Sequence, residues 1–350
     1  KKYVRGSDLF DTYALAVFRI PVNRKFTYRI PPEMEGKVLP GMRIEAPFHG
    51  SLNEGIVCEI TREAPDVEIF DITRTVDTVP VLTSYQIELA SWMAEHYMAS
   101  LGESLYKMLP AGRRQPAAHR KTKTQAAARH VLNEEQAKVF GIIKEEIGAD
   151  HGGKVPVHLI HGITGSGKTE IYIHLILETL ARGKGAILLV PEISLTVQMV
   201  SRLEEVFRGD LALLHSALTG SVRFGGYISL LRQEKRIAVG TRSAVFAPVK
   251  DPGIIIIDEE HDGSYREHSA PRYDARQVAW KRCQDQGAVL VLGSATPAGR
   301  GEVVRADGEV VARQKRTFDI PVSARRLSSA LRHLAASLAD QAPGGIAAVG

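Results

Sequence analysis

The sequence predicts an α/β fold, in which a parallel sheet with helices on both of its faces follows a smaller domain rich in β-strands. From Val155 onward, short apolar runs alternate with helical patterns, as they do in sheets whose strands are buried on both faces. Before residue 76, short strand patterns are separated by prolines, which is typical of a compact barrel.

The composition restricts the class of protein. The chain has 350 residues, 44% of them hydrophobic and 24% charged, so it can form two or three soluble domains with a buried core. Its net charge of +5 favours a polyanionic partner. The two cysteines, Cys58 and Cys283, exclude a disulfide framework and a cysteine-based zinc site, and they fit a reducing cytoplasm. No apolar run reaches the roughly 18–20 residues of a membrane helix, so we expect no membrane partner.

The first predicted domain covers residues 1–110. Its strand patterns lie at residues 13–17, 26–30, 42–46 and 55–60. Three aromatic residues among them, Phe26, Tyr28 and Phe48, could stack on nucleotide bases if they are exposed, at about 1–3 kcal/mol each. The alternative is that these rings belong to the core of the domain.

A helix is predicted over residues 84–109 because its apolar residues recur with the helical period, with a break at Gly102. Residues 111–130 form a basic linker, which is either solvated or in contact with a phosphate backbone. The next helix opens at Asn133, and Gln136 stands three residues on, as in a capping box. A glutamine just before a nucleotide-binding loop can also read the edge of adenine, and both roles remain open at this point.

Residues 157–170 hold the strongest motif. The apolar run Val157–Ile160 leads into the spacing G-x-x-x-x-G-K-T and then into a helical pattern, which is the strand–loop–helix setting of a P-loop. Glycines let the loop point its N–H groups at phosphate oxygens, and the helix N-terminus adds its dipole. Lys168 would neutralise the β- and γ-phosphates, and Thr169 would hold Mg²⁺. The predicted ATP-binding residues of this loop are Gly162, Thr164, Gly165, Ser166, Gly167, Lys168 and Thr169.

A second motif follows the apolar run 254–257, which ends at Asp258-Glu259. Asp258 is predicted to hold Mg²⁺ opposite Thr169, and Glu259 to orient the attacking water. Other predicted strands, at 186–190, 211–214, 237–239 and 288–292, also end in polar residues. The carboxyl ends of parallel strands share one edge of the sheet, where such folds bind their ligands.

The run Asp258-Glu259-Glu260-His261, together with Gly293-Ser294-Ala295-Thr296, resembles motifs II and III of superfamily 2 helicases, whose lobes are RecA-like. In that resemblance, His261 exchanges hydrogen bonds with Ser294 and Thr296 as the γ-phosphate comes and goes. The closer resemblance is to the primosomal replication-restart helicases, over residues 12–110 and 130–298. The segments that carry it are 162–170, 189–198, 214–216, 240–244, 258–265, 272–276 and 293–297.

This resemblance implies an ATP-dependent 3′-to-5′ DNA helicase that recognises stalled or branched forks and initiates primosome assembly. It implies ATP and Mg²⁺ as cofactors, and forked or single-stranded DNA, single-strand binding protein and primosome components as partners. It favours the adenine role for Gln136. The catalytic residues it implies are Lys168, Asp258, Glu259 and His261, and the DNA-contacting residues are Phe26, Tyr28, Phe48, Arg242, Tyr265, Arg272 and Tyr273.

The sequence departs from the family pattern in several places. Thr27 and His49 replace the usual residues of the 3′-end pocket, and Ala270-Pro271 replaces a glycine–aromatic pair in the DNA-sensing loop. We assign residues 131–298 to a first ATPase lobe and 299–350 to a divergent or truncated tail, without the second lobe or the zinc insertion. We therefore expect an amino-terminal portion that binds nucleotide with little turnover. The alternative is a non-catalytic module that binds fork DNA and binds ATP without hydrolysing it, whereas a kinase is disfavoured by the helicase-type motifs.

Overall fold

The computed structural model describes residues 12–63, 69–110, 130–163 and 165–295, and the backbone of two further strands at 300–304 and 310–315. These residues divide into two compact units. The first contains 12–110 together with Glu267–Tyr273, and the second contains the remainder from residue 130. No helix in the described ranges is long and apolar enough to cross a membrane.

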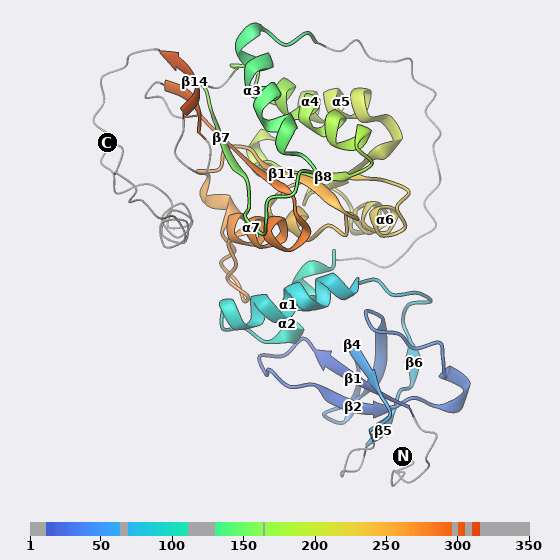
Figure 1. Ribbon diagram of the computed structural model, residues 1–350. Coiled ribbons are helices and arrows are strands. Elements are labelled where there is room, and N and C mark those ends of the chain that lie inside the picture. Colours follow the sequence, from blue (N-terminus) through green and yellow to red (C-terminus); the bar gives the residue numbers. More distant parts are fainter. Residues whose placement is uncertain are drawn as a thin grey trace. The chain divides into compact units, whose positions relative to one another are not determined.

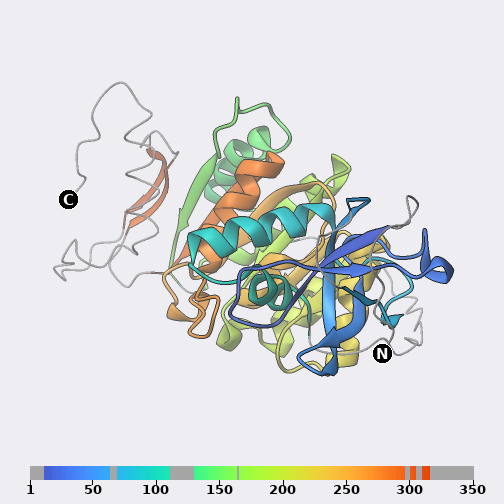
Figure 2. The same ribbon diagram turned by 90° about the horizontal axis from the view of Figure 1, so that it is seen from below.

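The first unit is a curled six-stranded sheet with two helices. Its strand order is β5-β2-β1-β4-β3-β6, and every neighbouring pair is antiparallel except β2–β5. Figures 1 and 2 show these strands in blue. The strands predicted from sequence are confirmed. The strands are β1 (Tyr13–Phe18), β2 (Phe26–Arg29), β3 (Arg43–Phe48), β4 (Ser51–Thr61), β5 (Phe70–Asp71) and β6 (Arg74–Thr75).

The helical region after the sheet differs from the prediction of one helix broken at Gly102. It consists of α1 (Ser84–His96) and α2 (Leu101–Met108), so the break lies before Gly102. Ser100 begins α2 with a capping box, in which its hydroxyl accepts from the Glu103 N–H. Gly102 lies inside α2, and a larger residue would not fit there, because a Cβ would lie 1.8 Å from the carbonyl oxygen of Phe18. The glycine therefore serves the close packing of α2 on β1.

The second unit is built on an eight-stranded sheet of order β14-β13-β7-β12-β11-β8-β10-β9. Its six strands from β7 to β9 are all parallel, and β13 and β14 join antiparallel at the β7 edge. The parallel strands that we predicted are confirmed. The strands are β7 (Val157–His161), β8 (Gly185–Leu189), β9 (Leu211–Leu214), β10 (Ile237–Gly240), β11 (Pro252–Ile257), β12 (Val289–Ser294), β13 (Arg300–Val304) and β14 (Val310–Lys315).

Helices cover both faces of this sheet, as right-handed crossovers between parallel strands require (Figure 1). One face carries α3 (Glu134–Glu146), α4 (Lys168–Ala181) and α5 (Val197–Phe207). The other carries α6 (Gly220–Leu231) and α7 (Ala275–Gln286). The result is a RecA-like lobe, in which the carboxyl ends of the parallel strands form one polar edge.

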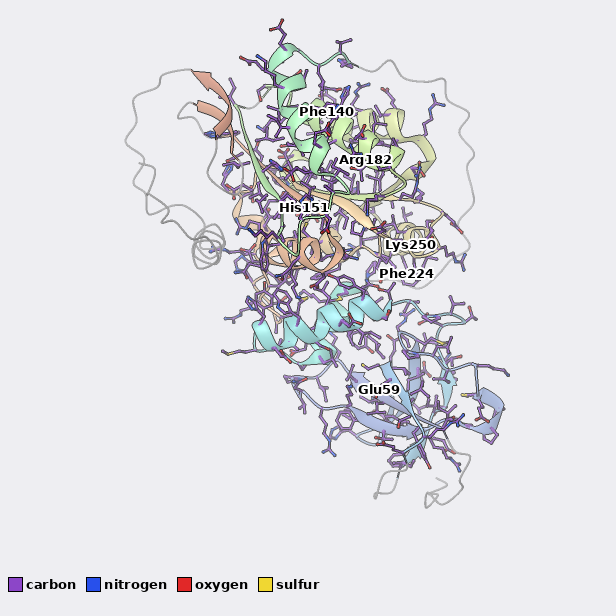
Figure 3. All side chains as sticks on the ribbon, viewed as in Figure 1. Glu59, Phe140, His151, Arg182, Phe224 and Lys250 are labelled. Carbon is purple, nitrogen blue, oxygen red and sulfur yellow. The ribbon has the colours of Figure 1, made fainter. Side chains whose placement is uncertain are left out.

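The helix before the P-loop strand packs on the helix after the loop. Phe140 of α3 lies edge-on to His174 of α4, with ring centroids 5.9 Å apart. Beyond the end of α4, Arg182, which is labelled in Figure 3, donates a hydrogen bond to the carbonyl oxygen of Ile147, just after α3. These contacts hold the middle and the C-terminal end of α3 against α4.

Candidate active site

The P-loop has the predicted strand–loop–helix setting. β7 ends at His161, and α4 begins at Lys168. Gly167 is the N-cap of α4 and has a left-handed backbone with φ 84°, which glycine adopts without strain. Gly162 passes close under the loop, since a Cβ there would lie 2.7 Å from the hydroxyl of Ser166. Thr164 lies outside the described residues. Thr169 occupies the first turn of α4 and is partly exposed.

Lys168 has two partners within the site. Its Nζ donates to the carbonyl oxygen of Gly162 at 2.7 Å and lies 3.3 Å from a carboxylate oxygen of Glu259. The residue is buried, at 7% exposure. Phosphate oxygens entering the loop would therefore compete with a carbonyl and a carboxylate for this ammonium group.

The carboxylates at the end of β11 differ in their surroundings. Burial raises the pKa of Asp258, while its Oδ1 accepts a hydrogen bond from the Tyr172 hydroxyl at 2.9 Å. Glu259 has a left-handed backbone with φ 44°, a conformation that costs energy in a residue with a Cβ. Its Oε2 accepts from the Ala295 N–H at 3.0 Å. The strand therefore presents one buried and one more accessible carboxylate at the same edge.

The structure brings together His261 and Ser294, the pair that the resemblance to superfamily 2 helicases implied. Ser294 Oγ lies 3.3 Å from His261 Nδ1, and the same nitrogen lies 3.7 Å from Glu259 Oε2. Thr296, the other predicted partner of His261, lies outside the described residues. The ends of β11 and β12 are thus joined by side-chain contacts as well as by their ladder.

Gln136 uses both ends of its amide within the chain. Its Oε1 accepts from the Asn133 N–H at 3.0 Å, which completes the predicted capping box. Its Nε2 donates to the carbonyl oxygen of Ser166 at 3.2 Å. The residue therefore caps α3 and ties that helix to the P-loop, and its role in reading adenine stays a prediction.

Three of the residues predicted to contact DNA are buried in the structure. Tyr28, Tyr265 and Tyr273 are 3%, 0% and 1% exposed. In two of them the ring is buried and the hydroxyl donates a hydrogen bond to a main-chain carbonyl oxygen. Tyr28 donates to Pro47 at 3.0 Å and Tyr265 to Asp258 at 2.6 Å.

The remaining predicted DNA contacts lie nearer the surface. Phe26 and Phe48 are partly exposed and pack edge-on, with ring centroids 4.9 Å apart. Phe48 also stacks on Phe18 at 4.3 Å. Arg272 is exposed. Arg242 donates to main-chain carbonyls, among them Ser264 at 3.2 Å. Tyr28 is therefore a core residue of the first unit, and the rings of Phe26 and Phe48 pack against that core while staying partly exposed.

Sequence reasoning missed two contributors to the site. Tyr172 lies one helical turn after Lys168, so the i, i+4 spacing on α4 already placed it on the face toward the strand ends. Arg276 is buried at 5% and donates to the carbonyl oxygen of Glu260 at 2.7 Å, while it pairs with Asp274 at 2.6 Å. No spacing rule predicts the contact between Arg276 and Glu260, two residues that lie sixteen positions apart in the sequence.

Comparison with known families agrees with both units. Residues 16–110 match the PriA 3'DNA-binding domain (3'BD), and residues 122–302 match the DEAD/DEAH box helicase family. The second match covers just over half of the chain. It includes the P-loop, both carboxylates and the β12 motif.

Curated relatives named "Replication restart protein PriA" are similar to the chain. The protein of Treponema pallidum (strain Nichols) is 38% identical over 296 residues, which cover 81% of this chain and 43% of the relative. That of Bacillus subtilis (strain 168) is 48% identical over 166 residues, 47% of this chain and 20% of the relative. That of Helicobacter pylori (strain J99) is 36% identical, over 74% of this chain and 39% of the relative. The chain thus matches between a fifth and just over two-fifths of these relatives' length.

Proposed function

We propose that this chain, which belongs to the DEAD/DEAH box helicase family, binds ATP with Mg²⁺ in the P-loop site and forked or single-stranded DNA elsewhere, as part of a 3′-to-5′ helicase of replication restart. One observation carries the proposal. Lys168, Glu259, His261 and Ser294 form a continuous set of contacts at the carboxyl edge of the sheet, with Asp258 beside them.

The residues present fit a magnesium ion bound together with phosphate. Among the described residues, no group of three or more His, Cys, Asp or Glu side chains could hold a metal alone. Mg²⁺ commonly takes one or two protein ligands and completes its shell with phosphate and water, and here Thr169 and Asp258 would supply those ligands. When bound, the ion would neutralise charge on the transferring phosphoryl group.

The chain's own groups then have distinct tasks. Lys168 would exchange Gly162 and Glu259 for phosphate oxygens. Glu259, freed from that ion pair, would orient the attacking water. The His261–Ser294 contact would relay the change to the end of β12.

The DNA role is proposed for the first unit, whose sequence is similar to the PriA 3'DNA-binding domain. The partly exposed cluster of Phe26 and Phe48 offers a stacking surface at a strand 3′ end, and the exposed Arg272 offers charge for the phosphate backbone. Contacts with single-strand binding protein and primosome components, and a place in the cytoplasm beside that DNA, belong to the same proposal.

Hydrolysis by this chain alone is expected to be slow. The described residues contain one RecA-like lobe, and an arginine finger supplied from outside such a lobe is worth about 10³–10⁵ in rate. The test is equilibrium binding of a fluorescent ATP analogue and ATP turnover, each with and without forked DNA. Lys168→Ala is expected to abolish nucleotide binding, whereas the exposed Lys154→Ala serves as its matched control.

The outcomes separate the two candidate functions. ATP turnover that forked DNA stimulates and Lys168→Ala abolishes supports the ATPase proposal. ATP binding without turnover, together with fork binding that persists in Lys168→Ala, would instead support the non-catalytic module. In either case, DNA affinity should fall with salt, with a slope of about −0.7 for each single-strand phosphate contact.

A further inference from the structure

Asp258 is held by a tyrosine from another element. Tyr172 of α4 is fully buried at 0% exposure, and its ring belongs to the core beneath the sheet edge. Its hydroxyl donates to Asp258 Oδ1 at 2.9 Å. Because the ring is packed on all sides, the hydroxyl has a fixed position, so it also fixes the carboxylate that it contacts.

The space for this contact is left by Gly293 on β12. A Cβ at residue 293 would lie 1.8 Å from the Tyr172 hydroxyl oxygen and 2.9 Å from Asp258 Oδ1. Gly293 lies on a regular strand, so a left-handed backbone does not explain the glycine. The absence of a side chain at 293 is what allows α4, β11 and β12 to meet at a hydroxyl–carboxylate bond.

A second tyrosine holds the main chain of the same residue. Tyr265 is also fully buried and donates to the carbonyl oxygen of Asp258 at 2.6 Å. The side chain of Asp258 is therefore held by Tyr172, which precedes it in the sequence, and its main chain by Tyr265, which follows it. This arrangement offers two variants that remove the same chemical group but affect different parts of one residue.

We propose that Tyr172 is a positioning residue that orients the Asp258 carboxylate for Mg²⁺, with Gly293 providing the space. The role rests on the ATP and Mg²⁺ binding proposed above. A carboxylate has about four lone-pair sites, so the bond to Oδ1 leaves others for the ion or its water. Without the hydroxyl, the buried carboxylate loses one of its donors and is less firmly oriented. Loss of a hydrogen bond to a metal-binding side chain typically weakens metal affinity about 10–100-fold.

The experiment measures binding of a fluorescent ATP analogue to the whole chain as a function of Mg²⁺ concentration, including EDTA. For Tyr172→Phe, we expect affinity in EDTA within about twofold of wild type, because Lys168 and the loop are untouched. The Mg²⁺ concentration for half-maximal enhancement should rise at least about tenfold. Saturating Mg²⁺ should restore wild-type affinity, which a misfolded site would not allow.

Two controls separate positioning from packing. Tyr265→Phe removes the bond to the main chain of Asp258 and should shift the Mg²⁺ dependence less. Tyr227→Phe removes a hydroxyl from a buried tyrosine on α6 and should leave it unchanged. A Tyr172→Phe chain with wild-type Mg²⁺ dependence, or with affinity lowered equally in EDTA, overturns the positioning role alone. A wild-type chain that binds no nucleotide overturns the proposed function and this role together.

Discussion

Replacing Gly293 by alanine should damage the second unit severely, and the damage should depend on one oxygen atom. The new Cβ would lie 1.8 Å from the Tyr172 hydroxyl, where a carbon and an oxygen in contact stay about 3.3 Å apart. Relieving an overlap of about 1.5 Å requires a shift of α4 or β12 and breaks the bond to Asp258. We expect a loss of about 3–5 kcal/mol, from overpacking and from a lost bond to a charged group.

Removing that oxygen should recover part of the loss. In Gly293→Ala with Tyr172→Phe, the closest remaining distances are 3.0 Å to the ring carbon Cζ and 2.9 Å to Asp258 Oδ1. Shifts of a few tenths of an ångström relieve these. Tyr172→Phe alone should cost about 1.5–3 kcal/mol. The double variant should therefore be more stable than the sum of the single variants predicts, by about 2 kcal/mol.

The assay is urea unfolding in a Trp92→Phe background, where Trp280 on α7 is the remaining tryptophan and reports on the second unit. Gly225→Ala on α6 is the control, because its Cβ would meet no atom within 4 Å and should stabilise the helix by about 0.5–1 kcal/mol. An unchanged midpoint for Gly293→Ala, or strictly additive losses in the double variant, would refute the reasoning.

Three further predictions concern both units. Gly102→Ala should cost at least about 3 kcal/mol in urea unfolding, since the clash with Phe18 is with backbone that cannot rotate away. Tyr28→Phe should reduce the loss of unfolding free energy that occurs as the pH rises above about 10. Burial raises the pKa of Tyr28 to about 12, so the folded chain keeps a proton that the unfolded chain releases from about pH 10. Stability must then fall as pH rises between these values, and the variant should reduce the slope of unfolding free energy by up to about 1.4 kcal/mol per pH unit. Asp258→Asn should abolish the Mg²⁺ dependence of nucleotide binding yet raise the melting temperature at pH 7, because burial raises the pKa of Asp258 and so disfavours its charged form.

Periodicity predicted the second unit well because its strands are buried on both faces. Continuous apolar runs such as 254–257 have few other interpretations when helical patterns separate them, and the residues after each run share an edge by topology. The P-loop motif and Asp258 lie at that edge, whereas the His261–Ser294 pair was implied by the resemblance to superfamily 2 helicases. What the pattern could not give was the identity of contacts across elements, such as Tyr172 with Asp258 or Arg276 with Glu260.

Gly102 shows why local rules place a boundary wrongly. Glycine lowers helix propensity, so it predicted a break. In the structure, tertiary contact outweighs that cost, since only glycine lets α2 approach the backbone of Phe18. The correct boundary had its own signal, because Ser100 and Glu103 have the spacing of a capping box.

The tyrosines show a limit of a different kind. Residue type alone does not separate a ring that stacks on a base from one that fills a core, because tyrosine suits both when its hydroxyl finds an acceptor. Tyr28 and Tyr265 find carbonyl oxygens within their own unit. The acceptor of Tyr265 belongs to Asp258, so a residue that the resemblance linked to DNA holds the main chain of a predicted Mg²⁺ ligand.

Glu259 connects the events at this edge of the sheet. Its carboxylate lies 3.3 Å from Lys168, accepts from the Ala295 N–H at 3.0 Å and lies 3.7 Å from His261. A γ-phosphate that binds Lys168 would remove the only one of these partners with a permanent charge. The Glu259 carboxylate would then interact mainly with the Ala295 N–H and His261. Both of those residues contact β12 or follow it, so nucleotide binding would change the contacts at the end of that strand. The left-handed backbone at Glu259 fits this role, since a residue held in a costly conformation must be fixed by its surroundings. Under the proposed function, one carboxylate therefore links phosphate binding to the motif that follows β12.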